Sequence, residues 1–440
     1  MTEIDHLVIM AGGMGARLAA LAGDRPKVLV PVAGKAILEH QLDVALSVGV
    51  REVTIYAGYL ADMISDFVGD GSRFGLQIRV EIEDTPLGSA GAVVNSLDAL
   101  PEHFFVLYGD VMCAVDLAKM ASFHLQCGAD FTAMVHPNDH PFDSDLVEID
   151  AGEWIKVIHT CPHPEDKYFA NLVNAALYVV RRDSLRPWAG GSGKLDFVKD
   201  IMQGLLDQGG KVLAYVTTDY AKDMGTPERL EKVEADWNSG KITMPSAGNL
   251  APAVFLDRDG TLNVERGFLN SANDLELLPG VGAALKKLRD AGYRLVVVTN
   301  QPVLARGEAT EADLTAIHNR LEWELGKQGV FVDRIYYCPH HPDSGFEGER
   351  RELKIDCDCR KPGTAMVESA CQDLFLDPSR SWMIGDRAVD IEMARRAGLG
   401  SVLVGSGAGG SDGRFDVRAD HRVATLDEAA DAILAFPVEA

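Results

Sequence analysis

The hydrophobic positions of the chain fall in short runs that end abruptly in glycine or charged residues. One run, His6–Met10, continues into AGGMGARL, and another, Ala253–Leu256, continues into DRDGTLN. A short apolar run bounded by turn residues is typical of a parallel strand that is buried on both faces and carries polar residues at its carboxyl end. Each of the two runs therefore predicts a strand that leads directly into a ligand site.

Further runs predict the remaining strands of two sheets. In the first half they are Val53–Tyr56, Ile78–Val80, Phe104–Leu107, Phe131–Val135 and Ala176–Val180, and in the second half Arg294–Val298, Arg334–Tyr337, Trp382–Ile384 and Ser401–Val404. Helical stretches alternate with them at Ile37–Val48, Gly88–Leu97, 281–291 and 310–327. This alternation predicts an open α/β sheet in each half, with ligands bound at the strand ends.

The segment 238–252 separates the two halves. Its sequence, NSGKITMPSAGNLAP, is rich in glycine, serine, asparagine and proline, which is typical of a linker. The whole chain of 440 residues is too long for one compact core. We therefore predict one domain at 1–237, the linker at 238–252 and a second domain at 253–440. The two strand openings carry different chemistry, so we expect a fusion of unlike domains rather than a duplication.

The net charge of −24, from 42 Lys and Arg against 66 Asp and Glu, narrows the possible partners. A field of this sign repels nucleic acid and anionic lipid, so we expect neither as a partner, whereas a phosphorylated small molecule needs only a local basic pocket. The first apolar run lacks a preceding basic region and no apolar stretch reaches ~18 residues, which predicts neither a signal peptide nor a membrane span. Three of the seven cysteines fall within 338–359, which favours a metal site over disulfides and a reducing, cytoplasmic setting.

Glycines and cations follow the first strand. The glycines are Gly12, Gly13 and Gly15, and the cations are Arg17 and Lys27. Glycines here let the backbone approach phosphate oxygens, which the N–H groups of a following helix bind. The loop differs from the dinucleotide fingerprint because Leu18 stands at the third glycine position, and from a P-loop because no Gly-Lys-Ser/Thr follows. We interpret it as a nucleotide loop, with a plain strand-to-helix turn as the alternative.

Two aspartates of the first half are candidate magnesium ligands. Asp110 follows the predicted strand Phe104–Leu107, and Asp223 lies in the sequence KDMGTPE. Two carboxylates at strand ends can share a Mg²⁺ that bridges the phosphates of a nucleotide. Taken singly, each aspartate is more typical of a helix cap or a turn.

Together these motifs resemble the sugar-1-phosphate nucleotidyltransferases. The resemblance covers roughly residues 4–235 and rests on Met10-AGGMGARL, Arg25-Pro-Lys27, Pro86-Leu-Gly-Ser-Ala-Gly91, Tyr108-Gly-Asp110, Asn174 and Asp223-Met-Gly-Thr-Pro227. It implies a Rossmann-like, GT-A-like mixed sheet. It also implies in-line attack of a sugar phosphate on the α-phosphorus of a nucleoside triphosphate, with release of pyrophosphate.

The same resemblance implies roles for single residues. It assigns the triphosphate to Gly12, Gly13, Gly15 and Arg17, the charge at the α-phosphate to Lys27, the base or sugar to Gly88, Mg²⁺ to Asp110 and Asp223, and a substrate contact to Asn174. Arg17 and Lys27 are the expected catalytic cations.

The chain departs from that family at several positions. Cys161 stands where the family carries a lysine on the sugar phosphate, and Lys167 is a nearby substitute. Ala176 replaces the glycine of the usual Asn-Ala-Gly, and Ala16 replaces a loop threonine. Cys161 keeps open the alternative that this half binds nucleotide as a sensor or scaffold without catalysis.

A second constellation of polar residues occupies strand ends of the second half. Asp257 and Asp259 follow the strand Ala253–Leu256 at a spacing that lets one carboxylate attack phosphorus while the other protonates the leaving oxygen and then activates water. A Mg²⁺ is needed for an anionic carboxylate to approach a phosphate dianion. An acidic turn is the alternative for these two aspartates alone. The complementary groups are Thr299, Asn300, Arg360, Lys361, Asp386 and Asp390.

The motifs DRDGT, TN, RKP and GDRAVD, in this order, resemble those of the haloacid dehalogenase superfamily of phosphatases. The resemblance implies a parallel α/β sheet, with Asp257 as nucleophile and Asp259 as acid/base. It further implies phosphoryl binding by Thr299 and Lys361 beside Asn300 and Arg360, and Mg²⁺ binding by Asp257, Asp386 and the carbonyl of Asp259.

Four soft ligands form two tight pairs in the second half. They are Cys338, His340, Cys357 and Cys359. Three thiolates and an imidazole complete a tetrahedral structural zinc site that leaves no open position for catalysis. Free buried cysteines, and His341 in place of His340, are the alternatives. A zinc-binding loop here would order Arg360 and Lys361, which follow directly.

DRDGTLN, NQPVLARG at 300–307, the zinc set and RKP together resemble the heptose bisphosphate phosphatases, a branch shared with histidinol phosphatases, over roughly residues 252–435. That branch removes the 7-phosphate of D-glycero-D-manno-heptose 1,7-bisphosphate. The heptose 1-phosphate product would feed the transferase half, so the two resemblances imply an NDP-heptose for surface polysaccharide.

The expected partners of such an enzyme are sugar phosphates and an NTP, with GTP preferred, and the expected cofactors are Mg²⁺ in both domains and structural Zn²⁺ in the second. The sequence leaves the oligomeric state open. The alternatives are a phosphatase of heptose bisphosphate or of histidinol phosphate whose first half is catalytically silent, and a purely structural interaction protein.

Overall fold

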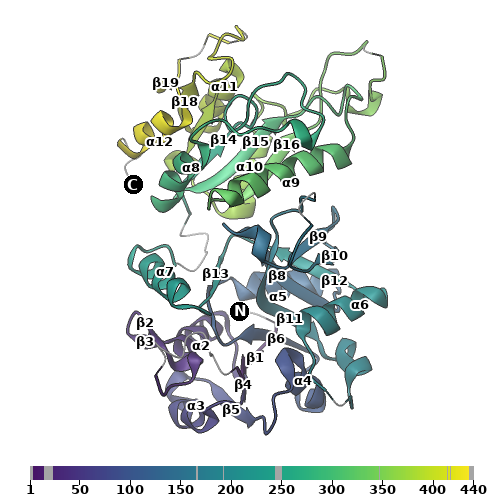
Figure 1. Ribbon diagram of the computed structural model, residues 1–440, viewed down its shortest axis with the longest axis vertical. Coiled ribbons are helices and arrows are strands. Elements are labelled where there is room, and N and C mark those ends of the chain that lie inside the picture. Colours follow the sequence, from purple (N-terminus) through teal and green to yellow (C-terminus); the bar gives the residue numbers. More distant parts are fainter. Residues whose placement is uncertain are drawn as a thin grey trace. The chain divides into compact units, whose positions relative to one another are not determined.

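The computed structural model describes residues 3–13, 23–164, 167–191, 193–242, 250–345, 347–413, 415–416 and 418–435. No helix in these ranges is long and apolar enough to cross a membrane. Contacts divide the chain into two compact units, the first comprising 1–136, 147–159 and 174–245 and the second 137–146, 160–173 and 246–440 (Figure 1). Each unit is built on its own sheet, which confirms the predicted fold class. Most of the predicted linker, 243–249, lies outside the described residues, and the predicted domain limits stay a prediction.

A nine-stranded sheet forms the centre of the first unit. Its strands are β1 (His6–Ala11), β4 (Glu52–Ala57), β5 (Gln77–Ile82), β6 (His103–Tyr108), β8 (Phe131–His136), β9 (Leu146–Ile149), β10 (Ile155–His159), β11 (Val173–Arg181) and β12 (Val212–Val216). They follow the order β10-β9-β11-β6-β1-β4-β5, and β8 pairs with β11 and β12. The sheet is mixed because β1 pairs in parallel with β4 and β6, whereas β11 runs antiparallel to β6.

Two small antiparallel pairs accompany this sheet. They are β2 (Pro31–Val32) with β3 (Lys35–Ala36), and β7 (Val111–Ala114) with β13 (Tyr220–Asp223). The second pair matters for function, because it joins two segments that lie far apart in the sequence and each carry a candidate metal ligand.

The helices of the first unit are α2 (Ile37–Val48), α3 (Ala61–Val68), α4 (Gly88–Asn95), α5 (Leu117–Cys127), α6 (Gln203–Asp207) and α7 (Pro227–Asn238). Local sequence sets several of their ends. Side-chain oxygens of Asp116 and Thr226 cap α5 and α7, and Gly49 ends α2 in the left-handed conformation. The bounds of α2 are those predicted from the sequence, whereas α4 ends at Asn95, before the predicted Leu97.

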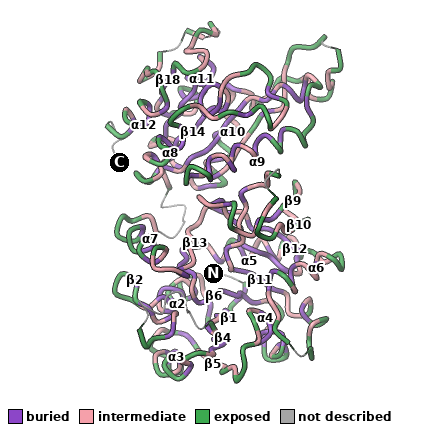
Figure 2. The backbone as a smooth tube through the Cα atoms, in the orientation of Figure 1, coloured by how far each residue is buried: buried purple, intermediate pink, exposed green. Residues whose placement is uncertain are grey.

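The core of the first unit lies along its central strands. Leu7 and Ile9 of β1 and Phe105 and Leu107 of β6 are almost fully buried, and Figure 2 shows the same for the middle of the sheet. Burying one such side chain contributes ~1.5–3 kcal/mol. These strands are therefore firmly placed, and so are the loops that leave their carboxyl ends.

The second unit is built on a six-stranded parallel sheet. Its strands are β14 (Ala253–Leu256), β15 (Arg294–Asn300), β16 (Arg334–Cys338), β17 (Trp382–Gly385), β18 (Gly400–Val404) and β19 (His421–Val423), and its helices are α8 (Val281–Asp290), α9 (Glu311–Lys327), α10 (Ala365–Leu374), α11 (Ala388–Ala397) and α12 (Leu426–Ala435). The order β16-β15-β14-β17-β18-β19 places β14 between β15 and β17. The carboxyl ends of these three strands meet at one edge, which is where a parallel sheet binds its ligands.

Two loops of the N-terminal half belong to the second unit. They are 137–146, which leads into β9, and 160–173, which follows β10. Both take part in its packing on α9, where the ring of Trp323 lies 6.2 Å from that of Tyr168, measured between centroids. Glu322 of the same helix accepts a hydrogen bond from the Asn171 N–H at 2.9 Å. Burial raises the pKa of the Glu322 carboxyl to about 7.

Candidate active sites and candidate metal centre

Three aspartates meet at the carboxyl edge of the parallel sheet. Asp257 directly follows β14 and Asp386 directly follows β17, and these strands are neighbours, with the Asp257 N–H donating to the Ile384 carbonyl at 2.9 Å. Asp390 joins them from the first turn of α11. All three residues are buried, and one oxygen of each lies within 4.8 Å of the others.

One buried lysine lies among these carboxylates. Lys361 Nζ is 2.7 Å from Asp257 Oδ1 and 2.6 Å from Asp390 Oδ1. Burial by itself would lower the pKa of Lys361, but the two carboxylates outweigh burial and raise it. Burial and the Asp257 charge raise the pKa of Asp386 to about 6. Three carboxylates around one lysine leave an excess of negative charge in a buried place.

This excess of charge makes the cluster a fitting site for a divalent cation. Among the described residues, the buried Asp386 Oδ1 has no hydrogen-bond partner, whereas its Oδ2 accepts from the Ala408 N–H at 2.6 Å. Carboxylate oxygens are the ligands that Mg²⁺ prefers. Gly260, the glycine of DRDGT, leaves space beside the Asp386 carboxylate. Its φ is +80°, and a Cβ there would lie 2.6 Å from Asp386 Oδ2.

Asp259 has a different environment from the other aspartates. Its carboxylate accepts hydrogen bonds from Arg258 at 2.7 Å, from Asn263 at 2.9 Å and from Gln301 at 2.9 Å. Burial alone would raise the pKa of Asp259, but Arg258 and the other donors lower it. The two aspartates of the DRDGT motif are thus held by different partners, and the donors around Asp259 favour its ionised form, in which it can accept a proton from water.

The predicted phosphoryl-binding residues lie at the end of β15 and in the loop before α10. Thr299 is buried at the end of its strand. Asn300 holds the backbone of Lys361, since its Oδ1 accepts from the Lys361 N–H at 2.9 Å and its Nδ2 donates to the Lys361 carbonyl at 3.3 Å. Arg360 donates to the His340 carbonyl at 3.1 Å. Asn300 and Arg360 therefore support the lysine loop here, and their direct contact with substrate stays a prediction.

The four predicted zinc ligands converge. Cys338 Sγ lies 3.6 Å from Cys357 Sγ and 3.1 Å from Cys359 Sγ, and His340 Nδ1 lies 3.3 Å from Cys359 Sγ. A tetrahedral zinc with Zn–S bonds of ~2.3 Å holds its sulfurs ~3.8 Å apart, so the donors fit such an ion after small adjustments. Burial and the neighbouring thiol of Cys359 raise the pKa of Cys338, so its thiolate needs a cation nearby.

Strand pairing brings the two aspartates of the first unit together. Asp110 immediately precedes β7, Asp223 ends β13, and the Met224 N–H donates to the Asp110 carbonyl at 2.8 Å. Lys27 forms an ion pair with Asp110, and Arg229 lies 2.6 Å from Asp223. Burial alone would raise the pKa of Asp223, but Arg229 and, more weakly, Lys27 lower it. Each carboxylate is thus paired with a basic side chain, and Arg229 contacts both oxygens of Asp223, so Mg²⁺ binding by Asp110 and Asp223 stays a prediction.

The predicted nucleotide loop leaves the end of β1. Gly12 and Gly13 follow the strand directly, whereas Gly15 and Arg17 lie outside the described residues. A Cβ on Gly12 would lie 2.4 Å from Glu83 Oε2. A larger residue at Gly12 would have to displace the Glu83 carboxylate, which follows β5.

Gly88 and Asn174 occupy positions with clear local roles. Gly88 begins α4 with a φ of +84°, and a Cβ there would meet the Leu195 carbonyl at 2.3 Å. Asn174 Nδ2 donates to the Tyr178 hydroxyl at 2.9 Å. Ala176 has a φ of +55°, so the chain carries an alanine where the backbone favours the family's glycine. The substrate contacts expected of Gly88 and Asn174 stay predictions.

The departure at Cys161 falls in one of the two loops that belong to the second unit. Cys161 is exposed, its N–H donates to Asp145 at 3.0 Å, and its Sγ donates to the Phe142 carbonyl at 3.8 Å. Lys167 is exposed in the same loop. These contacts fix the loop that carries Cys161.

Comparison with known proteins assigns a family to each half of the chain. A family model described as nucleotidyl transferase matches residues 6–240, more than half of the chain, and one described as HAD-hydrolase-like matches residues 358–429. The second half is 45% identical over 157 residues to the D-glycero-beta-D-manno-heptose-1,7-bisphosphate 7-phosphatase of Haemophilus ducreyi, which covers 35% of this chain and 84% of that protein. The chain belongs to the nucleotidyl transferase family in its first half and to the HAD-like phosphatases in its second.

The chain is also similar to a second curated protein and to solved structures. The 7-phosphatase of Salmonella typhi is 44% identical over 157 residues, which span 36% of this chain and 81% of that protein. Among solved structures, HddC from Yersinia pseudotuberculosis is 26% identical with a TM-score of 0.47, over 53% of this chain and 100% of that one. The D,D-heptose 1,7-bisphosphate phosphatase of B. bronchiseptica, complexed with magnesium and phosphate, is 32% identical with a TM-score of 0.37, over 42% of this chain and 98% of that one.

Several polar residues of the two family sites were missed by the sequence reasoning. Arg258 and Gln301 lie inside quoted motifs, yet their contacts with Asp259 were not foreseen, and Asp390 was named without a role. The available signal for Arg258 was a charged residue directly after a buried strand, where it is itself 0% exposed. Glu83 lies three residues before the quoted Pro86–Gly91 segment, but only its closeness to Gly12 marks it as a candidate site residue.

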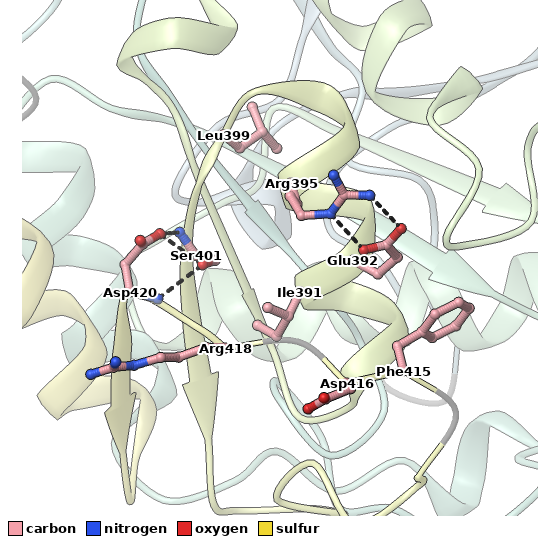
Figure 3. A pocket seen from close by; sticks show the side chains of 9 residues that line it. All are labelled: Ile391, Glu392, Arg395, Leu399, Ser401, Phe415, Asp416, Arg418 and Asp420. Atoms are coloured by element: carbon pink, nitrogen blue, oxygen red, sulfur yellow. Dashed lines mark hydrogen bonds and ion pairs between the residues drawn. The ribbon is translucent and has the colours of Figure 1, made fainter.

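The HAD-like half also has a surface hollow of about 570 Å³ beside α11. Figure 3 shows the side chains that line it, and two pairs among them interact. Arg395 lies 2.8 Å from Glu392, and Ser401 donates to Asp420 at 2.8 Å. None of the predicted site residues lines this hollow, so it is separate from the catalytic cluster.

Proposed function

We propose that the chain is a bifunctional enzyme of NDP-heptose synthesis. Its second half removes the 7-phosphate of D-glycero-D-manno-heptose 1,7-bisphosphate, and its first half transfers GMP from GTP to the resulting heptose 1-phosphate. The observation that carries the proposal is the buried cluster of Asp257, Asp386 and Lys361, in a half that is 45% identical to a 7-phosphatase. The product of the first reaction is a sugar 1-phosphate, the class of substrate that the transferase half would consume.

In the phosphatase reaction, an Asp257 oxygen attacks the phosphorus of the 7-phosphate, and the ester oxygen leaves with a proton from Asp259. The resulting aspartyl-phosphate is hydrolysed by a water molecule that gives its proton to Asp259. Lys361, in its ion pair with Asp257, stabilises the negative charge of the phosphoryl group. Thr299, with the support of Asn300 and Arg360, completes the phosphoryl site.

Asp257, Asp386 and the carbonyl of Asp259 would hold Mg²⁺ in this site, and Asp390 adds a further carboxylate close by. The ion, when bound, offsets the repulsion between these carboxylates and the phosphate dianion. The support for it is the excess of buried negative charge and Asp386 Oδ1, which within the described residues has no hydrogen-bond partner and only a 3.9 Å ion pair with Arg387.

In the transferase reaction, a phosphate oxygen of heptose 1-phosphate attacks the α-phosphorus of the nucleotide in line, and pyrophosphate leaves. Lys27 stabilises the charge that spreads over the α-phosphate oxygens. Asp110 and Asp223 would hold a Mg²⁺ that neutralises the triphosphate, and their closeness through β7 and β13 supports this. The glycine loop with Arg17 binds the phosphates, Gly88 faces the base or sugar, and Asn174 contacts the substrate.

Glu83 supports guanine as the base. Its carboxylate lies against Gly12 at the start of the phosphate loop. Among the described residues, its buried Oε1 has no hydrogen-bond partner, and burial raises the pKa of the group. A carboxylate accepts hydrogen bonds from two adjacent N–H donors, and guanine presents such a pair at N1 and N2. The favoured donor substrate is therefore GTP.

Structural zinc and a cytoplasmic location belong to the same proposal. The Cys338, His340, Cys357 and Cys359 set supports zinc, since its donor atoms lie within 4.8 Å of one another. Thiolate ligands require reduced cysteines, and nucleoside triphosphates are available in the cytoplasm. The product, an NDP-heptose, would serve lipopolysaccharide or capsule synthesis.

One observation favours a second candidate, a phosphatase with a silent transferase half. Cys161 stands at the expected lysine position and is exposed, and its thiol carries no positive charge for a sugar phosphate. In this case the first half would bind nucleotide without transferring it.

A two-product assay tests the proposal. The purified protein is given Mg²⁺, heptose 1,7-bisphosphate and each NTP in turn, and phosphate and pyrophosphate are measured. We expect phosphate in every reaction and pyrophosphate with GTP.

Asp257→Asn should abolish phosphate release but keep pyrophosphate release from supplied heptose 1-phosphate, and Asp110→Asn should do the reverse. Phosphate alone would establish the silent alternative, and absence of phosphate would refute the phosphatase assignment.

A further inference from the structure

A buried glutamine connects two groups of the phosphatase site that perform different tasks. Gln301 follows β15 and is 3% exposed. Its Nε2 donates to Asp259 Oδ2 at 2.9 Å and to Thr299 Oγ1 at 2.8 Å. Its N–H donates to the carbonyl of Cys338, at the end of β16, at 2.8 Å, so the backbone is anchored as well.

The orientation of this amide is determined by its neighbours. Gln301 Oε1 accepts from Arg258 Nη2 at 2.9 Å, and the same guanidinium nitrogen donates to Asp259 Oδ2 at 2.7 Å. A flipped amide would turn its oxygen toward the Asp259 carboxylate and its NH₂ toward the Arg258 cation, and both contacts would be repulsive. Arg258, 0% exposed, therefore fixes the direction in which Gln301 donates.

This direction has a consequence for Thr299. A threonine hydroxyl has one proton and two lone pairs. Because Thr299 Oγ1 accepts from Gln301, one lone pair is occupied and the hydroxyl proton is directed to another acceptor. A phosphoryl oxygen at the end of β15 is such an acceptor, so the glutamine prepares Thr299 as a donor.

We propose that Gln301 is a positioning residue of the phosphatase, which holds the Asp259 carboxyl and the Thr299 hydroxyl in one rigid array. The proposal rests on the proposed phosphatase function. In the step concerned, the bond from Asp257 oxygen to phosphorus forms, the bond from phosphorus to the ester oxygen breaks, and the proton of Asp259 passes to that oxygen. Without Gln301, Asp259 keeps its two other donors but loses the contact that ties it to the phosphoryl site.

The choice of leaving group separates positioning from a structural role. A sugar alkoxide is a poor leaving group and needs the proton, whereas p-nitrophenolate leaves without one. General acid catalysis contributes ~10²–10⁴-fold to such steps. We compare kcat/KM, which reports the reaction up to release of the first product, for heptose 1,7-bisphosphate and for p-nitrophenyl phosphate.

The variant Gln301→Met keeps the volume and removes the donors. We expect kcat/KM to fall ~100-fold for the bisphosphate, because Asp259 is no longer aligned with the ester oxygen, although loss of a donor by itself favours the protonated form of Asp259. For p-nitrophenyl phosphate we expect a fall of at most about fivefold, from the weakened Thr299 contact. Gln301→Glu keeps the contact with Arg258 but places an acceptor against Asp259, and it should show the same selective loss. Retained hydrolysis of p-nitrophenyl phosphate reports that each variant is folded.

Gln203→Met is the matched control, because Gln203 donates to Asp207 at 2.8 Å in an exposed pair of the same kind. It should change neither substrate's kcat/KM. Equal losses on both substrates in both Gln301 variants, or no loss on the bisphosphate, would overturn the proposal. A wild-type protein inactive on both substrates would instead refute the phosphatase function itself.

Discussion

Lys361 and Asp257 form a buried ion pair, with 2.7 Å between Nζ and Oδ1. Asp390 Oδ1 lies 2.6 Å from the same ammonium. Asn300 holds the lysine backbone through both its N–H and its carbonyl. The charge of the proposed nucleophile is therefore balanced before substrate arrives, by a cation that is already fixed where a phosphoryl group would enter.

Removing this cation should affect activity and stability together. In Lys361→Met, the neighbouring carboxylates lose their counter-charge, and breaking a buried pair costs ~3–5 kcal/mol. The loss should be greater at about pH 8 than at about pH 5, because the buried acids, whose pKa values are already raised, are then ionised. Urea unfolding at the two pH values measures it, and phosphate release should fall at least ~100-fold.

Lys35→Met provides the comparison for that variant. Lys35 pairs with Asp43 at 2.8 Å, but both side chains are about half exposed. An exposed pair contributes less than ~1 kcal/mol. A similar loss of stability in the two variants would show that burial of the Lys361 cluster does not determine its energetics.

Asp386 should make stabilisation by Mg²⁺ depend on pH. Its pKa in the folded protein is about 6, above the ordinary value, so ionisation costs folding free energy and the metal-free protein loses stability as pH rises from about 4 through 6. Bound Mg²⁺ offsets this cost. We expect Mg²⁺ to raise Tm more at about pH 7.5 than at about pH 5.

Asp386→Asn tests the assignment by thermal unfolding with and without Mg²⁺. The neutral amide should raise the metal-free Tm near pH 7.5, because it removes buried repulsion, and should reduce the shift caused by Mg²⁺. An unchanged Mg²⁺ shift in this variant would place the ion elsewhere.

The apolar runs predicted much of the fold because the central strands of both sheets are buried on both faces, so their hydrophobicity is continuous. β13 escaped prediction, since its sequence YAKD is partly polar and its strand conformation depends on pairing with β7. The closeness of Asp110 and Asp223 depends on the same pairing. Contacts such as that of Gln301 with Asp259 are tertiary, so no spacing in the sequence reports them. The motifs predicted the type of reaction, whereas the contacts of each side chain are visible only in the structure.

Ala176 offers a test of backbone strain. A left-handed conformation costs an L-residue ~1–2 kcal/mol, and glycine removes this cost at an entropic loss of ~0.4–1 kcal/mol in the unfolded state. With its φ of +55°, Ala176→Gly should therefore stabilise the first unit slightly, by up to ~1 kcal/mol. Urea unfolding measures the change. Destabilisation would indicate that the methyl group makes a packing contact worth more than the strain.

Zinc removal should separate the two activities. Arg360 donates to the His340 carbonyl, and Lys361 follows it, so loss of the metal should disorder the loop that carries the catalytic lysine. We expect chelation, or Cys357→Ser, to lower the Tm and the rate of phosphate release. Pyrophosphate release from supplied heptose 1-phosphate should be unaffected. Bound zinc is measured by elemental analysis.

Cys371→Ser is the control, because this cysteine lies outside the ligand set. It should retain its zinc and its phosphatase activity. Zinc-free protein with full phosphatase activity would contradict a role for the metal in ordering Lys361.

Glu83 should control the choice of nucleotide. Its carboxylate faces the Gly12 loop, and within the described residues Oε1 has no hydrogen-bond partner, so it can accept from guanine N1 and N2. Glu83→Gln replaces one acceptor oxygen with an NH₂ that opposes the guanine donors. When a site hydrogen-bonds a specific group of its substrate, loss of those hydrogen bonds lowers kcat/KM for that substrate strongly. The kcat/KM for GTP should therefore fall ~100-fold or more, while that for ATP should change little. Pyrophosphate release with each NTP measures this.

Glu81→Gln, on the exposed pair with Arg79 at 3.0 Å, is the control. Equal losses with GTP and ATP would mean that Glu83 supports the loop and does not read the base.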